Sequence, residues 1–263
     1  MTVLRIAVVQ HDIVWESREQ TLARLEPTVG SAAAGGARLV VLSEMFAVGF
    51  SMNVGLTAEP DDGPTTQWIR GQARRHGIWI CGSLPVQVSD GGLPFNAFVL
   101  AGPGGELHGY RKIHPFTYGG EREAFAAGQD IVTFDVEGVR VTPFLCYDLR
   151  FADVFWEAAA ATDVYVIPAN WPDTRRRHWT ALLIARAIEN QAYVVGCNRV
   201  GTGGRLTYVG DSAVVSPMGD PLACAAEVET TLLVDVDTSR VAAVRAQFPF
   251  MGDRRQPPSS RPA

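Results

Sequence analysis

Short runs of β-branched and other apolar residues recur along the whole chain, and stretches with the periodicity of an amphipathic helix separate several of them. Buried strands favour apolar runs of roughly four to eight residues, whereas a helix repeats its apolar positions roughly every three to four residues. The pattern predicts strands at residues 5–10, 38–42, 78–83, 95–100, 139–145, 164–168, 193–197, 211–216 and 231–236. It predicts helices at residues 18–30, 65–76, 151–161 and 175–190.

This alternation of strands and helices indicates an α/β protein. The predicted strands outnumber those of one simple doubly wound sheet, so the pattern favours two sheets packed together with helices outside. Turns rich in glycine and proline join neighbouring strands at residues 90–92, 102–105 and 217–220. We expect a single domain over residues 1–263, with an Arg-, Pro- and Ser-rich tail from about residue 252 that extends or packs on a neighbouring surface.

The charge of the chain argues against some classes of partner. The 263 residues carry a formal net charge of −5, and the Lys and Arg residues are scattered, with no basic stripe. We therefore expect a small molecule as the partner, and neither a nucleic acid nor a membrane. The N-terminal segment starts as a core strand without the features of a signal peptide, and no apolar run is long enough to span a membrane, so we expect a cytoplasmic protein.

The four cysteines are Cys81, Cys146, Cys197 and Cys224, and none are spaced like a metal-binding pair. In a reducing cytoplasm, neither structural disulfides nor a zinc cluster is expected. Cys81, Cys197 and Cys224 have small or apolar neighbours, which predicts that they are buried core residues. Cys146 differs, because its surroundings are polar.

Cys146 stands at the exit of an apolar strand, where residues 144–151 turn abruptly polar. A thiol beside Asp148 and Arg150 can be held as a reactive thiolate, so this position indicates a nucleophile. The chain has no phosphate-binding glycine loop, no Gly-x-Ser-x-Gly and no His-Glu-x-x-His. Their absence argues against a nucleotide enzyme, a serine hydrolase and a zinc protease.

A cysteine nucleophile needs a base for the thiol proton and a group that stabilises an oxyanion. Glu44, at the end of an apolar strand, is a candidate base, although a capping or surface Glu fits the same pattern. Lys112 could stabilise an oxyanion, but it could also be a solvated surface lysine. Glu121 and Glu123 lie in one glycine-led loop, and the residues alone do not choose between them.

A Cys-His pair is the competing assignment, with His114 or His178 as the base. His178 lies at the start of an amphipathic helix, where a structural histidine is the more common interpretation. His114 fits either role.

Taken together and in this order, Glu44, Lys112 and Cys146 resemble the Glu-Lys-Cys triad of the nitrilase, or carbon-nitrogen hydrolase, superfamily. The segments around the three residues are similar to family blocks, and the likeness runs from the first strand to about residue 250. Four further segments are similar to the omega-amidase branch in particular: 169–172, 178–179, 185–194 and 196–201.

The resemblance implies a fold and a set of roles. The fold would be a four-layer α-β-β-α sandwich, with Cys146 following a strand. The family places a second glutamate seven residues before a glycine, which selects Glu121, seven before Gly128, over Glu123. No cofactor and no metal are implied, because Lys112 supplies the positive charge. The chain would form a homodimer through helices near residues 151–161 and 175–190.

The implied reaction is hydrolysis of the terminal amide of small dicarboxylic monoamides, such as 2-oxoglutaramate and 2-oxosuccinamate, through a thioester. Glu44 would be the base, while Lys112 and the backbone N–H of Tyr147 would hold the oxyanion. The same triad could instead act on deaminated glutathione, an N-carbamoyl amine or a nitrile. A non-catalytic scaffold member is a further alternative, against which the intact triad argues.

Five residues are candidates for substrate binding: Phe116, Tyr147, Arg150, Asn170 and Trp171. Arg150 and Tyr147 could bind the distal carboxylate, although we expect Arg150 to brace the loop through Asp148 or a helix carboxylate. Ala152 stands where many relatives have Pro. The loop 172–177 is unusually basic and could attract anionic substrates, although a solvated face is the more ordinary interpretation.

Overall fold

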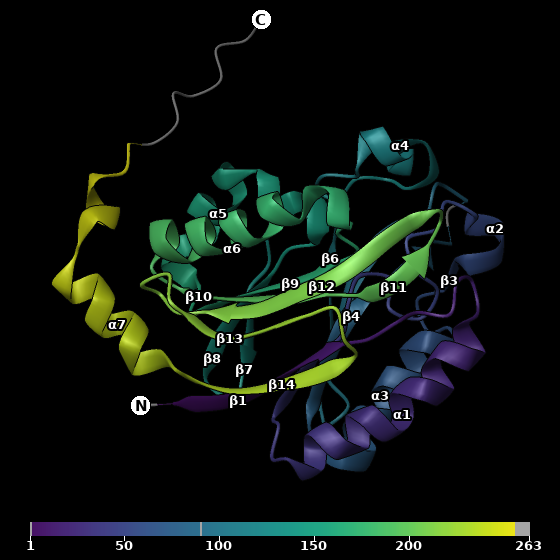
Figure 1. Cartoon of the computed structure of the whole chain (residues 1–263), viewed down its shortest axis with the longest axis horizontal. Coiled ribbons are helices and arrows are strands. Elements are labelled where there is room, and N and C mark those ends of the chain that lie inside the picture. Colours follow the sequence, from purple (N-terminus) through teal and green to yellow (C-terminus); the bar gives the residue numbers. More distant parts are fainter. Residues whose placement is uncertain (1, 90, 256–263) are drawn as a thin grey trace, which may run out of the picture.

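Within residues 2–89 and 91–255, the part of the chain that the computed structural model describes, two seven-stranded sheets pack face to face and helices cover their outer faces (Figure 1). The first sheet consists of β1 (Val3–Gln10), β2 (Leu39–Val41), β3 (Glu59–Pro60), β4 (Trp79–Gln87), β5 (Phe95–Ala101), β6 (Leu107–Arg111) and β14 (Thr230–Asp237). Its order is β14-β1-β2-β4-β5-β6, with β3 beside β4.

The second sheet consists of β7 (Phe134–Val136), β8 (Val139–Pro143), β9 (Val164–Ala169), β10 (Tyr193–Asn198), β11 (Val200–Gly203), β12 (Leu206–Val215) and β13 (Pro221–Ala226). Its order is β11-β12-β10-β9-β8-β7, with β13 beside β12. β8, β9 and β10 run parallel, as do β1, β2 and β4 in the first sheet. Each sheet is therefore mixed.

The helices form the two outer layers. The described helices are α1 (Arg18–Ala34), α2 (Val54–Thr57), α3 (Pro64–His76), α4 (Glu121–Ala124), α5 (Ala152–Ala158), α6 (Arg176–Asn190) and α7 (Thr238–Gln247). α1 and α3 cover the first sheet, and α5 and α6 cover the second (Figure 1). The prediction of a four-layer α-β-β-α sandwich is confirmed.

Strand β1 contributes side chains to the cores on both faces of the first sheet. Ile6 and Val8 belong to the core between the sheets, whereas Ala7 and Val9 belong to the core shared with α1 and α3. Successive side chains of a strand point to opposite faces, so a continuous apolar run is what a strand buried on both faces requires.

The predicted strands and helices are all present, but some elements were missed. The short strands β3, β6, β7, β11 and β13 and the helices α2, α4 and α7 had no clear signal, because each is brief or partly exposed. The segment predicted as one helix at 151–161 is α5 followed by a 3₁₀ turn, Ala159–Ala161.

The prediction for Cys224 was wrong. Cys81 and Cys197 are buried, but Cys224 is exposed. Cys224 lies on β13, which pairs with β12 and turns much of its surface outward. Small neighbours do not distinguish a core strand from such an outer strand.

The turns at 102–105 and 217–220 join antiparallel strands as predicted. Asp90, in the predicted turn 90–92, lies outside the described residues, as do residues 256–263 of the tail. The start of the tail packs on the helical layer, where the Arg254 guanidinium lies 4.7 Å from the ring centre of Trp156. None of the helices among the described residues is both long and apolar enough to cross a membrane.

Candidate active site

Four of the predicted site residues lie just after strands that end in the same region between the sheets. Glu44 follows β2 and Lys112 follows β6, both in the first sheet. Cys146 follows β8 and Asn170 follows β9, in the second. Strand ends commonly carry the side chains of a ligand site in α/β proteins, because the strands hold them rigidly while the chain there is free to vary.

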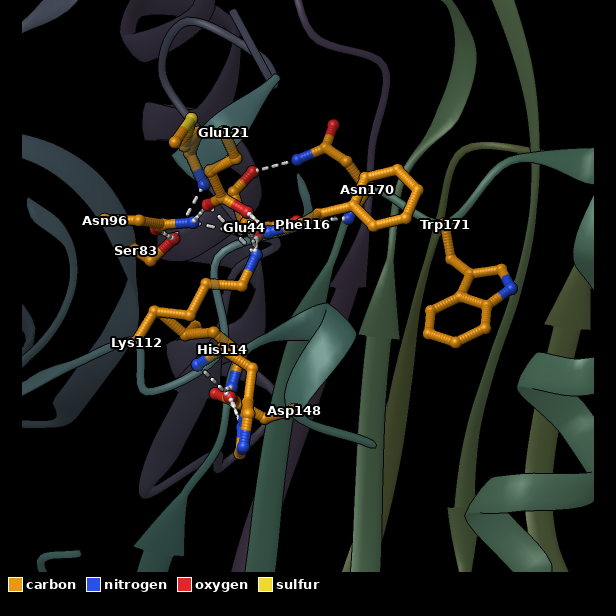
Figure 2. A network of polar contacts seen from close by, with 12 residues as sticks. Glu44, Ser83, Asn96, Lys112, His114, Phe116, Glu121, Asp148, Asn170 and Trp171 are labelled. Carbon is orange, nitrogen blue, oxygen red and sulfur yellow. Dashed lines mark hydrogen bonds and ion pairs between the residues drawn. The ribbon is translucent and has the colours of Figure 1, made fainter. Parts of the chain in front are cut away.

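Lys112 lies between two carboxylates (Figure 2). Its Nζ is 2.7 Å from Glu44 Oε1 and 2.8 Å from Glu121 Oε2. All three side chains are buried, with at most 1% exposed. Glu123, in contrast, is exposed. The geometry therefore places Glu121, and not Glu123, beside Lys112.

Gly128 explains part of the position of Lys112. Its N–H donates to the Lys112 carbonyl oxygen at 2.7 Å, and a Cβ on Gly128 would lie only 2.2 Å from the Arg111 carbonyl oxygen. Only glycine permits so close an approach of two backbones. The segment that carries Lys112 is thus held against the loop that carries Glu121.

Two further polar residues, which the sequence reasoning missed, bind the carboxylates (Figure 2). The amide of Asn96 donates to Glu44 Oε1 and to Glu121 Oε1, at 2.8 Å each. Ser83 Oγ donates to Asn96 Oδ1 at 2.8 Å, which orients that amide. Their signal in the sequence was a polar residue within each of two largely apolar predicted strands, 78–83 and 95–100. Both side chains are buried in the structure.

The charges of this cluster are coupled. Burial alone would lower the pKa of Lys112, but the adjacent Glu121 and Glu44 raise it above its ordinary value. Burial raises the pKa of Glu121, as does the charge of Glu44, while Lys112 opposes the shift. Lys112 therefore stays protonated, as a fixed positive charge next to Cys146.

Cys146 begins a short 3₁₀ helix, Cys146–Arg150, and has a left-handed backbone with φ of 42°. Met45, next to Glu44, has the same φ of 42°. A non-glycine residue in this region costs about 1–3 kcal/mol, and such strain is common at functional sites. Tyr147 lies in the first turn of the 3₁₀ helix, where backbone N–H groups lack an intrahelical acceptor.

The thiol of Cys146 is not ionised by its surroundings. Burial raises its pKa, and Glu44 raises it further by its charge and by a hydrogen bond. Lys112 and the backbone N–H of Asn170 act in the opposite direction. That N–H also donates to Glu44 Oε2, at 3.0 Å. Cys146 is thus a neutral thiol beside an acceptor for its proton.

The two histidines proposed as alternative bases are engaged elsewhere. His114 Nδ1 is 2.8 Å from Asp148 Oδ1, and the imidazole stacks on Phe151 with ring centres 3.8 Å apart. His178 Nδ1 is 3.3 Å from Arg150 Nη2. The groups that act on the Cys146 thiol are Glu44, Lys112 and Asn170, so the structure does not support a Cys-His pair.

The thiol opens into a cavity of about 410 Å³. All five predicted substrate-binding residues line it: Phe116, Tyr147, Arg150, Asn170 and Trp171. The sequence reasoning missed several other lining residues: Trp15, Phe50, Arg175, Leu206 and Tyr208. Of these, only Arg175 had a signal, since it belongs to the basic loop. This volume suits a small organic molecule.

Two arginines of the cavity wall lie over aromatic rings. The Arg150 guanidinium is 4.6 Å from the ring centre of Trp171, and that of Arg175 is 5.4 Å from the ring centre of Phe116. Neither forms an ion pair with a carboxylate among residues 2–89 and 91–255. Burial lowers the pKa of Arg150, and the nearby charge of Arg175 lowers it too.

The expectation that Arg150 braces the loop through Asp148 or a helix carboxylate was wrong, because its guanidinium contacts His178 and no carboxylate among the described residues. Asp148 is buried and accepts hydrogen bonds from Tyr110, from the Leu145 N–H and from His114, at 2.7 to 2.9 Å. These donors, which come from both sides of Lys112 and from the end of the strand before Cys146, occupy both of its oxygens. Arg150 points to the cavity instead.

The chain is similar to known carbon-nitrogen hydrolases along most of its length. The family model described as Carbon-nitrogen hydrolase matches residues 5–246. The chain is 36% identical to the omega-amidase YafV of Escherichia coli strain K12, with 95% of this chain and 96% of the relative covered. It is 30% identical to a 2-oxoglutaramate amidase of Bacillus subtilis strain 168, with 95% and 97% covered.

A solved structure is also similar. XC1258 from Xanthomonas campestris is described as a CN-hydrolase superfamily protein with an arsenic adduct in its active site. It matches with a TM-score of 0.93 at 36% identity, and the match covers 99% of this chain and all of that one.

Proposed function

Because this chain belongs to the carbon-nitrogen hydrolase family, we propose that it is an omega-amidase that hydrolyses the terminal amide of small dicarboxylic monoamides such as 2-oxoglutaramate and 2-oxosuccinamate. The observation that carries the substrate class is the pair Arg150 and Arg175, two cations without a carboxylate partner among the described residues, in the cavity that contains Cys146. A substrate carboxylate would supply the missing negative charge.

In the first half of the reaction, Glu44 accepts the Cys146 proton and the thiolate attacks the amide carbon, so that a C–S bond forms. The raised pKa of the thiol supports this need for a base. The charge that develops on the carbonyl oxygen is held by Lys112 Nζ and the Tyr147 N–H. The C–N bond then breaks, Glu44 returns its proton to the nitrogen, and ammonia leaves a thioester.

In the second half, water attacks the thioester carbon while Glu44 accepts a water proton. The second tetrahedral intermediate uses the same two oxyanion donors. Its C–S bond breaks, the proton on Glu44 returns to the sulfur, and the carboxylic acid leaves. Glu44 can therefore act as the base in both halves of the reaction, because its carboxylate lies between the thiol and Lys112.

Glu121 acts through Lys112. Its two oxygens lie 2.8 and 3.0 Å from Lys112 Nζ, and its Oε2 also accepts the Phe116 N–H at 2.6 Å. It therefore fixes the ammonium group and one edge of the cavity wall together. Asn170 and the rings of Phe116, Tyr147 and Trp171 complete the binding surface.

A substrate panel tests this proposal by ammonia release. We expect 2-oxoglutaramate to be hydrolysed with a higher kcat/KM than 4-oxopentanamide, which has a methyl group in place of the carboxylate. The replacement Arg175→Met should lower kcat/KM for 2-oxoglutaramate by about 10- to 100-fold, because it removes a charge-assisted hydrogen bond to the substrate carboxylate. The same replacement should not change kcat/KM for 4-oxopentanamide, which has no carboxylate.

Arg177→Met is the matched control, since Arg177 belongs to the same basic segment, in the first turn of α6, but is not among the residues that line the cavity. An equal effect of both replacements would mean that the loop steers anions and does not bind them. Preference for a nitrile, an N-carbamoyl amine or deaminated glutathione would refute the substrate class. Undiminished ammonia release by Cys146→Ala would refute the mechanism and favour another nucleophile.

The assembly is a homodimer in this proposal. Apolar side chains are exposed on the outer helical layer and beside it: Trp156 on α5, Ile184 and Ile188 on α6, and Met218 and Leu222 near β13. Packing two copies through this face would remove these side chains from water. We place the enzyme in the cytoplasm, where a reducing environment would keep its four free thiols reduced.

A further inference from the structure

Tyr208 presents a hydroxyl group without a protein partner to the cavity. The residue is only 3% exposed and lines the same cavity as Cys146. Among residues 2–89 and 91–255, no group forms a hydrogen bond with its hydroxyl, which nevertheless is not enclosed by protein. Buried tyrosine hydroxyls usually have a hydrogen-bond partner. In the cavity, water or a ligand that displaces it can supply one.

The aromatic ring of Tyr208 is held rigidly. The guanidinium of Arg199 lies 4.6 Å from its ring centre. Arg199 is fully buried and is itself fixed by Asp12 Oδ1 at 2.6 Å and by the Thr202 carbonyl oxygen at 2.9 Å. The hydroxyl is therefore set in place before a substrate arrives, which makes it suitable for specificity.

The hairpin that carries Tyr208 is fitted against the cavity wall by glycines. A Cβ on Gly203 would lie 2.7 Å from the Trp15 ring, and one on Gly204 would lie 3.0 Å from it. These contacts join β11 and β12 to Trp15, which also lines the cavity. The hairpin that carries the hydroxyl is thus packed against both Trp15 and Arg199.

The hydroxyl remains a donor at neutral pH. Burial raises the pKa of Tyr208 to about 12, while the charge of Arg199 opposes this shift and that of Glu44 adds to it. Tyr208 and the reacting Cys146 line the same cavity. A neutral donor in this place suits a neutral acceptor on the substrate.

We infer that Tyr208 Oη donates a hydrogen bond to the 2-oxo oxygen of the substrate and makes the enzyme selective for monoamides of 2-oxo acids. The inference rests on the proposed function, in which Arg150 and Arg175 bind the carboxylate next to that oxygen. An amino acid amide such as glutamine has an ammonium group at this position. Its positive charge would lie near two guanidinium groups and could not accept from the phenol.

Two substrates that differ only in the 2-oxo group test the inference. Wild type should hydrolyse 2-oxosuccinamate with a higher kcat/KM than succinamate. Tyr208→Phe should lower kcat/KM for 2-oxosuccinamate by about tenfold, because it removes one neutral hydrogen bond. It should change kcat/KM for succinamate much less, because succinamate has no 2-oxo oxygen. Tyr193→Phe, which removes a hydroxyl bonded to the Asp237 carbonyl oxygen outside the cavity, should change neither value.

A binding measurement separates recognition from chemistry. In the Cys146→Ala background, calorimetry should show tighter binding of 2-oxoglutarate than of glutarate, and Tyr208→Phe should abolish the difference. No effect of Tyr208→Phe, or an equal loss for both members of each pair, would overturn the inference while omega-amidase activity stands. Failure of wild type to hydrolyse either monoamide would overturn the proposed function, and this inference with it.

Discussion

Cys146 depends on Glu44 in two opposite ways. The carboxylate raises the pKa of the thiol, above an ordinary value of 9.0, and in the proposed mechanism it also removes the thiol proton. Glu44→Gln should therefore reduce amide hydrolysis by about 10²- to 10⁴-fold, the usual contribution of a general base. At the same time it should move the pH dependence of Cys146 alkylation by iodoacetamide to lower pH, because Lys112 remains and favours the thiolate.

The direction in which the pH dependence of Cys146 alkylation moves tests whether Glu44 raises the pKa of the thiol. A group whose pKa is raised holds its proton at neutral pH and ionises only as the pH rises through the raised value. Alkylation should be followed at Cys146 by peptide mass spectrometry in a Cys224→Ala background, because Cys224 is exposed and would react as well. A shift to higher pH in Glu44→Gln would contradict the assigned electrostatics.

Among the elements, the turn that carries Cys146 and the segment that carries Lys112 are joined by one buried carboxylate. Asp148 accepts from the Leu145 N–H on the first side, and from Tyr110 and His114 on the second. Figure 2 shows the contact with His114. Asp148→Asn would turn an amide N–H₂ toward these donors. We expect the free energy of unfolding to fall by about 1–3 kcal/mol, the cost of unsatisfied buried groups, measured by urea denaturation.

Tyr110→Phe is the graded control, because it removes one of these hydrogen bonds and keeps the carboxylate charge. It should cost less stability than Asp148→Asn and retain more of kcat. If Asp148→Asn lowers neither stability nor kcat, the carboxylate does not hold the two segments in place.

For the whole molecule, the exposed apolar face of α5 and α6 is the basis of the dimer prediction. Ile188 is 47% exposed on α6. Ile188→Asp should convert a dimer of the 28.5 kDa chain to a monomer in analytical ultracentrifugation, because a buried unpaired charge disfavours association. A stable interface needs roughly 800 Å² on each partner, which a face of two helices can provide.

Leu56→Asp is the matched control. Leu56 is 55% exposed on α2, which lies away from α5 and α6 (Figure 1). It should leave the dimer intact. A wild-type chain that sediments as a monomer at micromolar concentration would rule out this assembly.

The sequence by itself determined the layered α/β fold and the candidate triad. The run of residues 6–9 is apolar at every position because both faces of the strand are buried there, and such a local requirement is visible in the sequence. Glu44, Lys112 and Cys146 were recognisable because each stands in a distinctive segment. The single-domain expectation for residues 1–263 stays a prediction.

Only the tertiary structure decided what those residues contact. Ser83 lies on β4 and Asn96 on β5, so the hydrogen bonds that connect them to Glu44 arise from sheet pairing, which no local pattern indicates. Arg150 faces the cavity, and not Asp148, because Tyr110 on β6 and His114 after β6 already occupy that carboxylate. Sequence patterns indicate whether a position is buried. The direction of a side chain and the group to which it hydrogen-bonds depend on segments that are distant in the chain.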